Sequence, residues 1–508
     1  MKNKLHDKCP CVAVLGTGSD VGKSIIATAL CRYFVNQGKA VAPFKAQNMS
    51  NNSGVTPEGL EMGRAQIVQA EAARISPGVD MNPVLLKPTT EYGSQVIVGG
   101  TAVATSCAAD YYKKKDELFE RACQSLDTLR RTHDLVVIEG AGSCAEVNLL
   151  EHDFVNFRTA EYADAPVILV ADIHRGGVFA QIVGTLACLP QALQDRVAGF
   201  IINRFRGDIS LFAGGAEWIE KQTGKPVFGV LPWSDDIVIE QEDSVVLERS
   251  TASAAGAGGN NRIAVIRLPH ISNFTDFDPL AATGGISLCF VERPADLSDY
   301  RAVILPGSKN TLADLAWLKK TGFDRELCRY AENGGHVLGV CGGYQMLGQR
   351  ILDPDGIESP HGEAVGLGLL PAETVLRAPK TTTLTRFAWD AAAGEGYEIH
   401  MGETVRSGGA PLFSVNSRNM EACDDEDGCV AEQGRVMGTY IHGLFDSAGI
   451  LEKWLSNIGA AGCRLPEHVG LAARNREYDR LAAHFAAHMN MELIEQLMDQ
   501  VIEQGIFT

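Results

Sequence analysis

The sequence predicts an α/β protein that contains two parallel-sheet domains. Short, nearly continuous apolar runs alternate with helical patterns, which is typical of strands buried between layers of helices. This alternation occurs twice, over residues 1–249 and again over 262–455, and the small-residue sequence 250–261 separates the two series. A chain of 508 residues also exceeds what one hydrophobic core usually supports. We therefore expect two domains, a linker at 250–261 and a helical C-terminal extension at 456–508.

The strands of both domains are predicted from their apolar runs. In the first domain these runs are VAVLG (12–16), AVAPFK (40–45), DLVVIEG (134–140), PVILVAD (166–172), VAGFIIN (197–203) and PVFGVLP (226–232). In the second domain they are RIAVIRLP (262–269), RAVILPG (301–307), HVLGVCG (336–342) and VMGTYIHG (436–443). The C-terminal extension has helical periodicity, clearest in LAAHFAAHMNMELIEQLMDQVIEQ, and its many acidic residues favour a packed cap over a membrane anchor.

Composition limits the partners and the compartment that we expect. Lys+Arg minus Asp+Glu is 45 − 63 = −18, which argues against nucleic-acid binding. No stretch approaches the ~20 apolar residues that span a bilayer, and the first strand follows the start without a signal segment. Thirteen cysteines lack the spacing of a disulfide framework or a zinc site, which suits a reducing compartment. We expect a cytoplasmic protein without membrane or nucleic-acid partners; its oligomeric state stays open, a homo-oligomer included.

A glycine-rich loop follows the first predicted strand and precedes a good helix. Its sequence, GTGSDVGKS (16–24), lets backbone N–H groups face an anion, and the helix N-terminus adds its dipole. Lys23 can reach the outer phosphates of a nucleotide, and the Ser24 hydroxyl suits Mg²⁺. Thr17 stands where the usual motif has its first glycine. We expect ATP to bind along Thr17, Gly18, Gly22, Lys23 and Ser24.

This loop variant resembles the dethiobiotin-synthetase-like branch of P-loop NTPases, which activate carboxylates by phosphorylation. The resemblance implies a parallel sheet with helices on both faces. It also implies that Lys45 is a second phosphate-facing lysine, that Glu139 binds Mg²⁺ together with Ser24, and that Asn203 contacts adenine. The alternatives are a solvated strand end for Lys45, a capped turn for Glu139 and a turn former for Asn203.

A second motif indicates a nucleophile. The strand HVLGV ends on Cys341, and a helical sequence follows at once, so the turn exposes the sulfur at a helix N-terminus. Gly339 and Gly343 flank the cysteine because side chains there would crowd the turn. A buried structural cysteine is the alternative interpretation.

The stretch GVCGGYQ resembles the class I glutamine amidotransferase signature, in which the cysteine attacks the side-chain amide of glutamine. The resemblance implies an α/β glutaminase domain, oxyanion contacts from Gly342 and from Gly307 of LPGSKN, and glutamine binding by Gln345. The nucleophile needs a base, and His442 of GTYIHG lies at the expected strand end. His400 of YEIHMG is the rival.

One position departs from that family. Class I glutaminases usually carry a glutamate two residues after the histidine, where this chain has Leu444. The carboxylate that orients the histidine is therefore missing from its normal place. Asp446 and Glu403 are candidates to replace it, and the Cys341–His442 dyad is the minimal prediction.

The two motifs together are consistent with an ATP-dependent amidation that uses ammonia from glutamine. ATP converts a carboxylate into an acyl phosphate, and ammonia made from glutamine then displaces phosphate. The stretches FKAQNMSNNS, GRAQIVQAEAA, NPVLLKP, DIHRGGVFA and INRFRGD resemble the cobyric acid synthase family along nearly the whole chain. The resemblance implies amidation of the b, d, e and g carboxylates of adenosylcobyrinic acid a,c-diamide in cobalamin biosynthesis, with the corrinoid as substrate and no bound redox cofactor. Asp172 and Arg175, after a strand's carboxyl end, are candidate corrinoid contacts.

Other functions remain as alternatives. The a,c-diamide synthase uses the same two modules on an earlier substrate, but it lacks the QNMSNNS element. A dethiobiotin-type ligase without a glutaminase conflicts with a functional Cys341. A partitioning-type P-loop ATPase, from a different class, conflicts with the acidic balance and the attached glutaminase motif. A pseudoenzyme that only binds ligands would have no use for an intact Cys–His pair.

Overall fold

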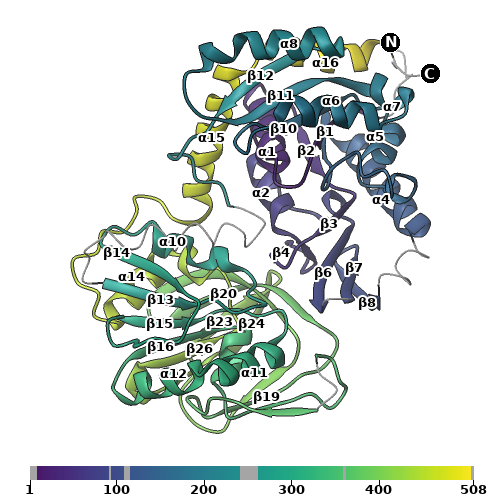
Figure 1. Cartoon of the computed structure of the whole chain (residues 1–508). Coiled ribbons are helices and arrows are strands. Elements are labelled where there is room, and N and C mark those ends of the chain that lie inside the picture. The colour runs from purple at the N-terminus through teal and green to yellow at the C-terminus, as the bar shows by residue number, and fades with distance from the viewer. Residues whose placement is uncertain (1–7, 91–92, 108–114, 241–260, 359–361, 505–508) are drawn as a thin grey trace. The chain divides into compact units, whose positions relative to one another are not determined.

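The computed structural model describes residues 8–90, 93–107, 115–240, 261–358 and 362–504, and the structural statements below concern these residues. Two compact units make up the chain (Figure 1). The first comprises Met1–Met49, Met62–Glu240 and Arg474–Thr508, and the second comprises Ser50–Glu61 and Gln241–Ala473. This division differs from the predicted one in two places, because 50–61 groups with the second unit and the chain's end groups with the first. Apart from Asn261, the predicted linker lies outside the described residues.

A six-stranded parallel sheet forms the centre of the first unit. All six predicted runs are strands, in the order β12 (Val227–Pro232), β11 (Val197–Phe205), β10 (Val167–Asp172), β1 (Cys11–Gly16), β9 (Leu135–Glu139) and β2 (Val41–Phe44). The carboxyl ends of parallel strands meet at one edge, where such sheets bind ligands. That edge carries the phosphate loop, Lys45, Glu139, Asp172 and Asn203.

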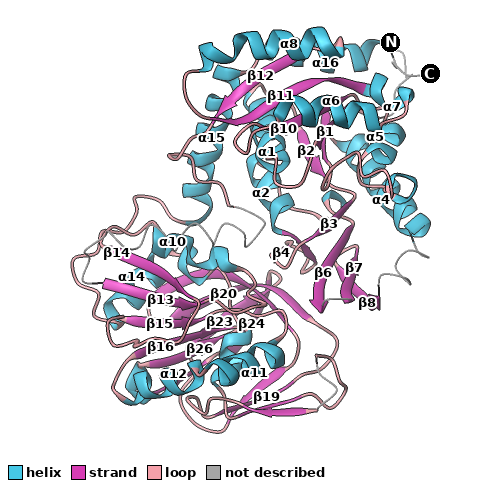
Figure 2. Cartoon of the chain, viewed as in Figure 1, coloured by secondary structure: helices cyan, strands magenta, loops and turns pink. Residues whose placement is uncertain are grey.

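Helices cover both faces of this sheet, as predicted (Figure 2). Alternate residues of β1 enter two separate cores, because side chains of a strand point to opposite faces. One core includes α1 (Lys23–Asn36) and α2 (Arg64–Ala72), and the other includes α4 (Lys115–Thr132), α5 (Phe157–Ala163) and α6 (Val178–Cys188). The remaining elements of the unit are α7 (Gln191–Arg196), α8 (Ala213–Thr223) and a small sheet of β3 (Gln47–Met49), β6 (Val84–Thr90), β7 (Gly93–Val98) and β8 (Thr101–Cys107).

The C-terminal sequence forms two helices, α15 (Gly470–His488) and α16 (Met491–Gln504). Tyr478 and Phe485 of α15 and Ile494 of α16 are buried in the same core as α1. Arg32 of α1, itself 1% exposed, donates to the Asp479 carboxylate of α15 at 2.8 and 3.0 Å. From Arg474 onward, the predicted cap is therefore part of the first unit.

The second unit has its own sheet, in the order β14 (Ile286–Val291), β13 (Asn261–Ile266), β15 (Ala302–Leu305), β16 (His336–Val340), β26 (Val436–Thr439) and β25 (Cys429–Ala431). Its strands are parallel except β25, and the four predicted runs are among them. Its helices are α10 (Asp278–Ala281), α11 (Thr311–Thr321), α12 (Phe323–Glu332), α13 (Gly342–Leu347) and α14 (Ala448–Asn457). The α/β fold class is thus confirmed in both units.

Two four-stranded sheets in the second unit lie outside the sequence prediction. One is β18 (Glu363–Val365), β17 (Arg350–Leu352), β19 (Ala372–Val375) and β22 (Glu403–Arg406). The other is β21 (Ala392–His400), β20 (Thr381–Trp389), β23 (Phe413–Arg418) and β24 (Glu421–Asp427), joined by antiparallel pairing. These strands are half-exposed and rich in polar residues, so they lack the continuous apolar runs that revealed the buried strands.

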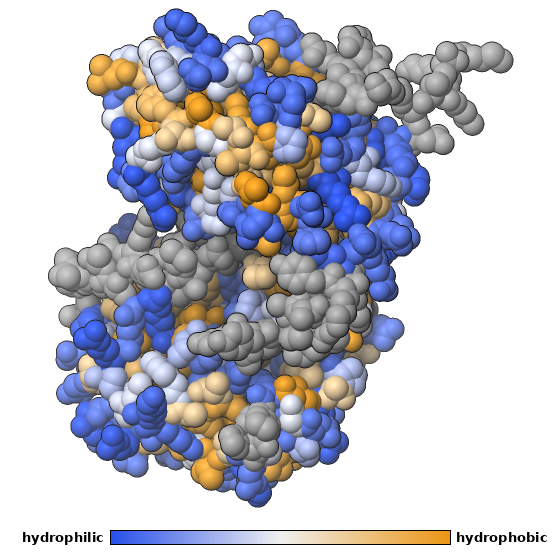
Figure 3. Space-filling view, turned by 45° about the vertical axis from the view of Figure 1, so that its right-hand side comes forward, coloured by the Kyte–Doolittle hydropathy of each residue, from blue (hydrophilic) through white to orange (hydrophobic). Residues whose placement is uncertain are grey.

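Polar and apolar residues mix over the surface, and on the face shown in Figure 3 apolar residues gather on the first unit. The first unit as a whole exposes large apolar side chains that include Leu211, Trp218 and Val238. Within the described part of the chain, no helix combines the length and the apolar character needed to cross a bilayer.

Candidate active sites

The phosphate loop connects β1 to α1. Gly22 is the N-cap of α1 and has a φ of 99°, which favours glycine, and a Cβ there would lie 2.0 Å from Nδ2 of Asn203. Asn203 in turn donates from Nδ2 to the Val21 carbonyl at 2.8 Å. The backbone N–H of Thr17 donates to the Val170 carbonyl of β10 at 3.0 Å. The loop is therefore held by the ends of two neighbouring strands.

A buried cluster surrounds Glu139, which is 1% exposed. One oxygen, Oε1, accepts from Ser24 Oγ at 2.8 Å and from Lys45 Nζ at 3.1 Å. The other oxygen accepts from the Gln69 amide. Burial acts to raise the pKa of Glu139, but Lys45 and the hydrogen bonds from Ser24 and Gln69 outweigh it, so the pKa lies below its usual range. The structure brings Ser24, Lys45 and Glu139 together, as the sequence predicted.

The arrangement suits a hard cation. A hydroxyl and a carboxylate oxygen lie side by side, and Mg²⁺ prefers such ligands completed by water and phosphate oxygens. Gln69 Oε1 is buried without a hydrogen-bond partner among the described residues, so an open acceptor adjoins the carboxylate. Lys23 Nζ donates to the carbonyls of Gly18 and Gly142 at 3.0 and 2.8 Å. Burial lowers the pKa of Lys23 to about 8, although Glu139 acts to raise it.

The two candidate corrinoid contacts have different environments. Asp172 is 6% exposed and accepts from Arg204 Nη1 at 2.9 Å and from the His174 N–H at 2.7 Å. Arg175 lies exposed in the loop that follows β10. Asp172 therefore forms an ion pair with Arg204, a residue that the sequence prediction did not single out.

Cys341 lies at a sharp turn between β16 and α13, with φ 52° and ψ −110°. This conformation is rare for a residue with a side chain and marks a strained position. A Cβ on Gly343 would lie 1.9 Å from the Leu305 carbonyl oxygen, and one on Gly339 would lie 2.8 Å from the backbone of Gly343. Only glycine fits these positions, which confirms the predicted reason for both residues.

His442 is oriented by a carboxylate that sequence reasoning did not assign. Its Nδ1–H donates to Oδ2 of Asp276 at 2.6 Å, and both residues are buried. Asp276 Oδ1 also accepts from the Gly443 N–H at 3.0 Å. Burial acts to lower the pKa of His442, but the neighbouring Asp276 and Cys341 raise it to about 10. The Tyr397 ring stacks on the imidazole with its centroid 5.3 Å away.

The predicted replacements for the missing glutamate are therefore corrected. The Asp446 N–H donates to the Gly443 carbonyl, and Glu403 is exposed on β22, whereas Asp276 holds the ring. Asp276 lies in NFTDFD, far from His442 in sequence, so no spacing rule could have selected it. The rival base, His400, is engaged by Glu398 and the Gly402 carbonyl and stacks on Tyr440.

The candidate oxyanion groups converge beside this pair. A Cβ on Gly307 would lie 3.0 Å from Cε1 of His442, and one on Gly342 would lie 2.9 Å from the N–H nitrogen of Ser308. Gln345, 3% exposed, is fully engaged: its Oε1 accepts from Thr311 at 3.1 Å, and its Nε2 donates to the Met401 carbonyl at 3.0 Å and to Tyr440 at 3.1 Å. The Gln345 side chain therefore shapes the walls of the site.

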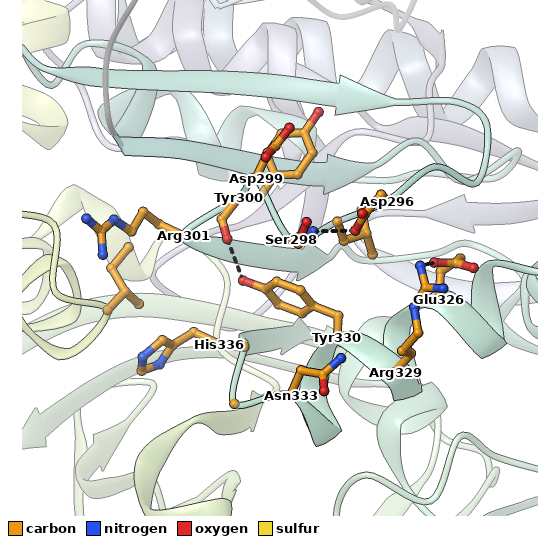
Figure 4. A pocket seen from close by; sticks show the side chains of 14 residues that line it. Asp296, Ser298, Asp299, Tyr300, Arg301, Glu326, Arg329, Tyr330, Asn333 and His336 are labelled. Atoms are coloured by element: carbon orange, nitrogen blue, oxygen red, sulfur yellow. Dashed lines mark hydrogen bonds and ion pairs between the residues drawn. The ribbon is translucent and has the colours of Figure 1, made fainter.

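A pocket of about 570 Å³ lies elsewhere in this unit (Figure 4). Its lining includes Arg301, Arg329, Tyr330 and His336, and the Tyr330 hydroxyl donates to the Tyr300 carbonyl. His336 begins β16 whereas Cys341 follows its end, so a strand about 16 Å long separates the pocket from the thiol. This pocket is distinct from the Cys–His site.

The comparisons with known proteins match one domain model to each of the two halves of the chain. A model of the CobQ/CobB/MinD/ParA nucleotide binding domain matches residues 12–245, and a model of the CobB/CobQ-like glutamine amidotransferase domain matches 262–450. A cobyric acid synthase of Chlorobium phaeobacteroides (strain BS1) is 51% identical over 491 residues, which are 96% of this chain and 99% of that protein. The chain belongs to the cobyric acid synthase family.

Further members of the cobyric acid synthase family match at similar levels. The protein of Pelodictyon phaeoclathratiforme is 49% identical over 502 residues, which cover 98% of this chain and 99% of its own. That of Syntrophobacter fumaroxidans is 46% identical over 503 residues, with 95% and 98% covered. The family resemblance inferred from sequence motifs is thus confirmed over nearly the full length.

Proposed function

We propose that this chain converts the b, d, e and g carboxylates of adenosylcobyrinic acid a,c-diamide into carboxamides, with ATP and glutamine as co-substrates. Family membership over nearly the full chain supports the substrate. The observation that carries the chemistry is the presence in one chain of two sites, the cluster of Ser24, Lys45 and Glu139 and the arrangement of Asp276, His442 and Cys341.

In the nucleotide site the reaction needs charge neutralisation around the transferring phosphoryl group. Lys23 and Lys45 would neutralise phosphate oxygens, and Ser24 and Glu139 would hold Mg²⁺, which supplies further positive charge. A substrate carboxylate oxygen attacks the terminal phosphorus of ATP, giving an acyl phosphate and ADP. Ammonia then attacks the acyl carbon, and inorganic phosphate leaves with the carbon–oxygen electron pair.

In the glutaminase site, the Cys341 thiolate attacks the carboxamide carbon of glutamine, and the N–H groups of Gly342 and of the Gly307 loop would hold the oxyanion. His442 gives its proton to the departing ammonia, leaving a thioester that water hydrolyses to glutamate. Asp276 keeps the imidazole in the tautomer whose Nε2 faces the sulfur. We place this chemistry in the cytoplasm, where ATP and glutamine are available and a nucleophilic thiol stays reduced.

The test follows the mass of the corrinoid in the presence of Mg·ATP and either glutamine or ammonium. Each amidation lowers the mass by about one dalton. Four successive steps with wild type, lost in Cys341→Ala with glutamine and recovered with ammonium, are expected. No mass change with either nitrogen donor would exclude this substrate, and cobyrinic acid, the a,c-diamide synthase substrate, would then be offered to the same proteins.

A further inference from the structure

A buried carboxylate adjoins the loop that is predicted to hold the oxyanion. Asp314, in the first turn of α11, is 0% exposed. Its Oδ2 accepts from the Ser308 hydroxyl at 2.6 Å, and its Oδ1 accepts from Nδ1 of His270 at 2.8 Å. The backbone nitrogen of His270 lies 3.3 Å from each of the two oxygens. The glutaminase chemistry described above assigns no role to Asp314 or to these two partners.

The partners of Asp314 compensate the cost of burying its charge. A buried carboxylate is unfavourable unless a cation and hydrogen bonds surround it. The hydrogen bond from His270 to Asp314 raises the pKa of His270 above its ordinary value of 6.5, although burial acts to lower it. The His270 ring is partly exposed, whereas the Asp314 side chain is not. Asp314 is therefore a fixed anchor for the segments of chain that supply its donors.

Asp314 holds one residue from each of two paired segments. Residues 270–272 run antiparallel to residues 307–309, and two backbone hydrogen bonds of 2.9 Å join them, one at each end. His270 belongs to the first segment and Ser308 to the second. The carboxylate thus fixes where both segments lie relative to α11.

Both segments lead to catalytic groups. A Cβ on Gly307 would lie 3.0 Å from Cε1 of His442, and a Cβ on Gly342 would lie 2.9 Å from the backbone nitrogen of Ser308. The other segment continues shortly afterwards to Asp276, which orients His442. The loop predicted to hold the oxyanion and the residue that orients the base are therefore attached to one buried carboxylate.

We propose that Asp314 is a positioning residue of the glutaminase, which holds the 307–309 segment where its N–H groups meet the oxyanion formed at Cys341. The inference rests on the proposed function and adds a residue to its glutaminase half. Preorganised donors stabilise an oxyanion because they already point toward it and do not reorganise as its charge develops. Without the carboxylate, the segment keeps its backbone pairing but loses its attachment to α11.

An acid in the first turn of a helix also stabilises that helix through the dipole, whatever lies nearby. This structural role and the positioning role predict different kinetics. Thioester formation from glutamine passes through an oxyanion, whereas in alkylation by iodoacetamide the Cys341 thiolate displaces iodide from carbon and no oxyanion forms. The ratio of the two rates therefore isolates the contribution of the oxyanion donors.

The experiment compares wild type with Ser308→Ala, Ser308→Thr, Asp314→Asn and Ser414→Ala. Ser308→Ala removes only the hydroxyl that Asp314 holds, and Ser308→Thr keeps a hydroxyl. Ser414, an exposed residue of β23 whose hydroxyl donates to the Ala388 carbonyl at 3.3 Å, is the matched control. Glutamate formation is measured against glutamine concentration with Mg·ATP and the corrinoid present. Iodoacetamide alkylation of Cys341, followed by peptide mass, and amidation with ammonium are measured in parallel.

We expect kcat for glutamate formation to fall about tenfold in Ser308→Ala and about a hundredfold in Asp314→Asn. The KM for glutamine should stay within about twofold of wild type, because only the transition state uses the oxyanion donors. Alkylation of Cys341 and amidation with ammonium should keep their wild-type rates. Ser308→Thr should recover most of kcat, and Ser414→Ala should match wild type.

Two results would overturn the proposal. One is a kcat within about twofold of wild type in Ser308→Ala and Asp314→Asn. The other is Cys341 alkylation that falls in proportion to kcat, because the nucleophile itself would then be disturbed. If Asp314→Asn does not fold, the two Ser308 variants decide, since they leave the carboxylate in place. A corrinoid that is never amidated would instead count against the proposed function, because glutamate formation and alkylation still test Asp314.

Discussion

Replacing Asp276 by asparagine tests the part of the glutaminase site that the sequence motif lacks. The variant keeps the size of the side chain and an oxygen that can accept from the Gly443 N–H. It removes the negative charge that lies 2.6 Å from His442 Nδ1. Since both residues are buried, solvent cannot replace that charge.

The structure sets the size of the expected effect. One hydrogen bond between charged, buried groups is worth about 1.5–3 kcal/mol. Asp276 stabilises the His442 imidazolium that gives its proton to the departing ammonia, so losing this hydrogen bond should slow glutamine hydrolysis by up to roughly 10- to 150-fold. Asp276 also helps to raise the pKa of His442 to about 10, so the variant histidine should lose its proton at a lower pH. The alkaline limb of the pH–rate profile should therefore move to lower pH.

The assay measures glutamate formation between pH 6 and 10, with ammonium-dependent amidation as an internal control for folding and for the nucleotide site. Asp446→Asn is the matched control, because it removes a carboxylate from the turn next to His442 that does not hold the ring. Asp276→Asn within twofold of wild type, or a larger loss in Asp446→Asn, would refute the assignment.

Three further predictions concern buried carboxylates. Glu139→Gln should abolish ATP-dependent amidation with either nitrogen donor and, by leaving Lys45 without its buried counter-ion, destabilise the protein by about 3–5 kcal/mol, measured by urea unfolding. Glu61→Gln should destabilise it by a similar amount while the double variant Glu61→Gln/Lys380→Met recovers most of the loss in the same assay, because no unpaired charge remains. Burial, and secondarily Glu398, raises the pKa of Asp427 to about 7. The protonated carboxyl therefore contributes stability that is fully present below pH ~4 and is lost as the pH rises through 7. Asp427→Asn should remove this pH dependence, which amounts to about 4 kcal/mol at most, from the free energy of unfolding.

The histidine has the same direction of pH dependence for a different reason. The pKa of His442 is raised from 6.5 to about 10, so the protonated form contributes stability below pH ~6.5 that is lost as pH rises through 10. Asp276→Asn should therefore also flatten the unfolding free energy over the alkaline range, which links the kinetic and thermodynamic measurements on one variant.

The sequence by itself determined the elements whose physics is local. The buried strands show as continuous apolar runs, and the phosphate loop and the Cys341 turn carry glycines that no other residue can replace, as the contacts at Gly22 and Gly343 show. Lys45, Glu139 and Asn203 were predicted from the resemblance to one branch of P-loop enzymes, and all three lie near the carboxyl ends of strands of one parallel sheet, which meet at one edge.

Only the tertiary structure decided how distant segments meet. Asp276 reaches His442 across 166 positions of sequence, and Asn52 accepts a hydrogen bond from the Asn273 N–H across 221 positions, so neither contact leaves a spacing pattern. The strands β17–β24 are half-exposed, so their pairing does not show as continuous apolar runs in the sequence. The packing of α15 and α16 against α1 likewise brings together the two ends of the chain, which only the tertiary fold decides. The sequence does not distinguish a polar side chain that is exposed to water from one that is buried against a hydrogen-bonding partner, because the partner is brought to it only by the tertiary fold.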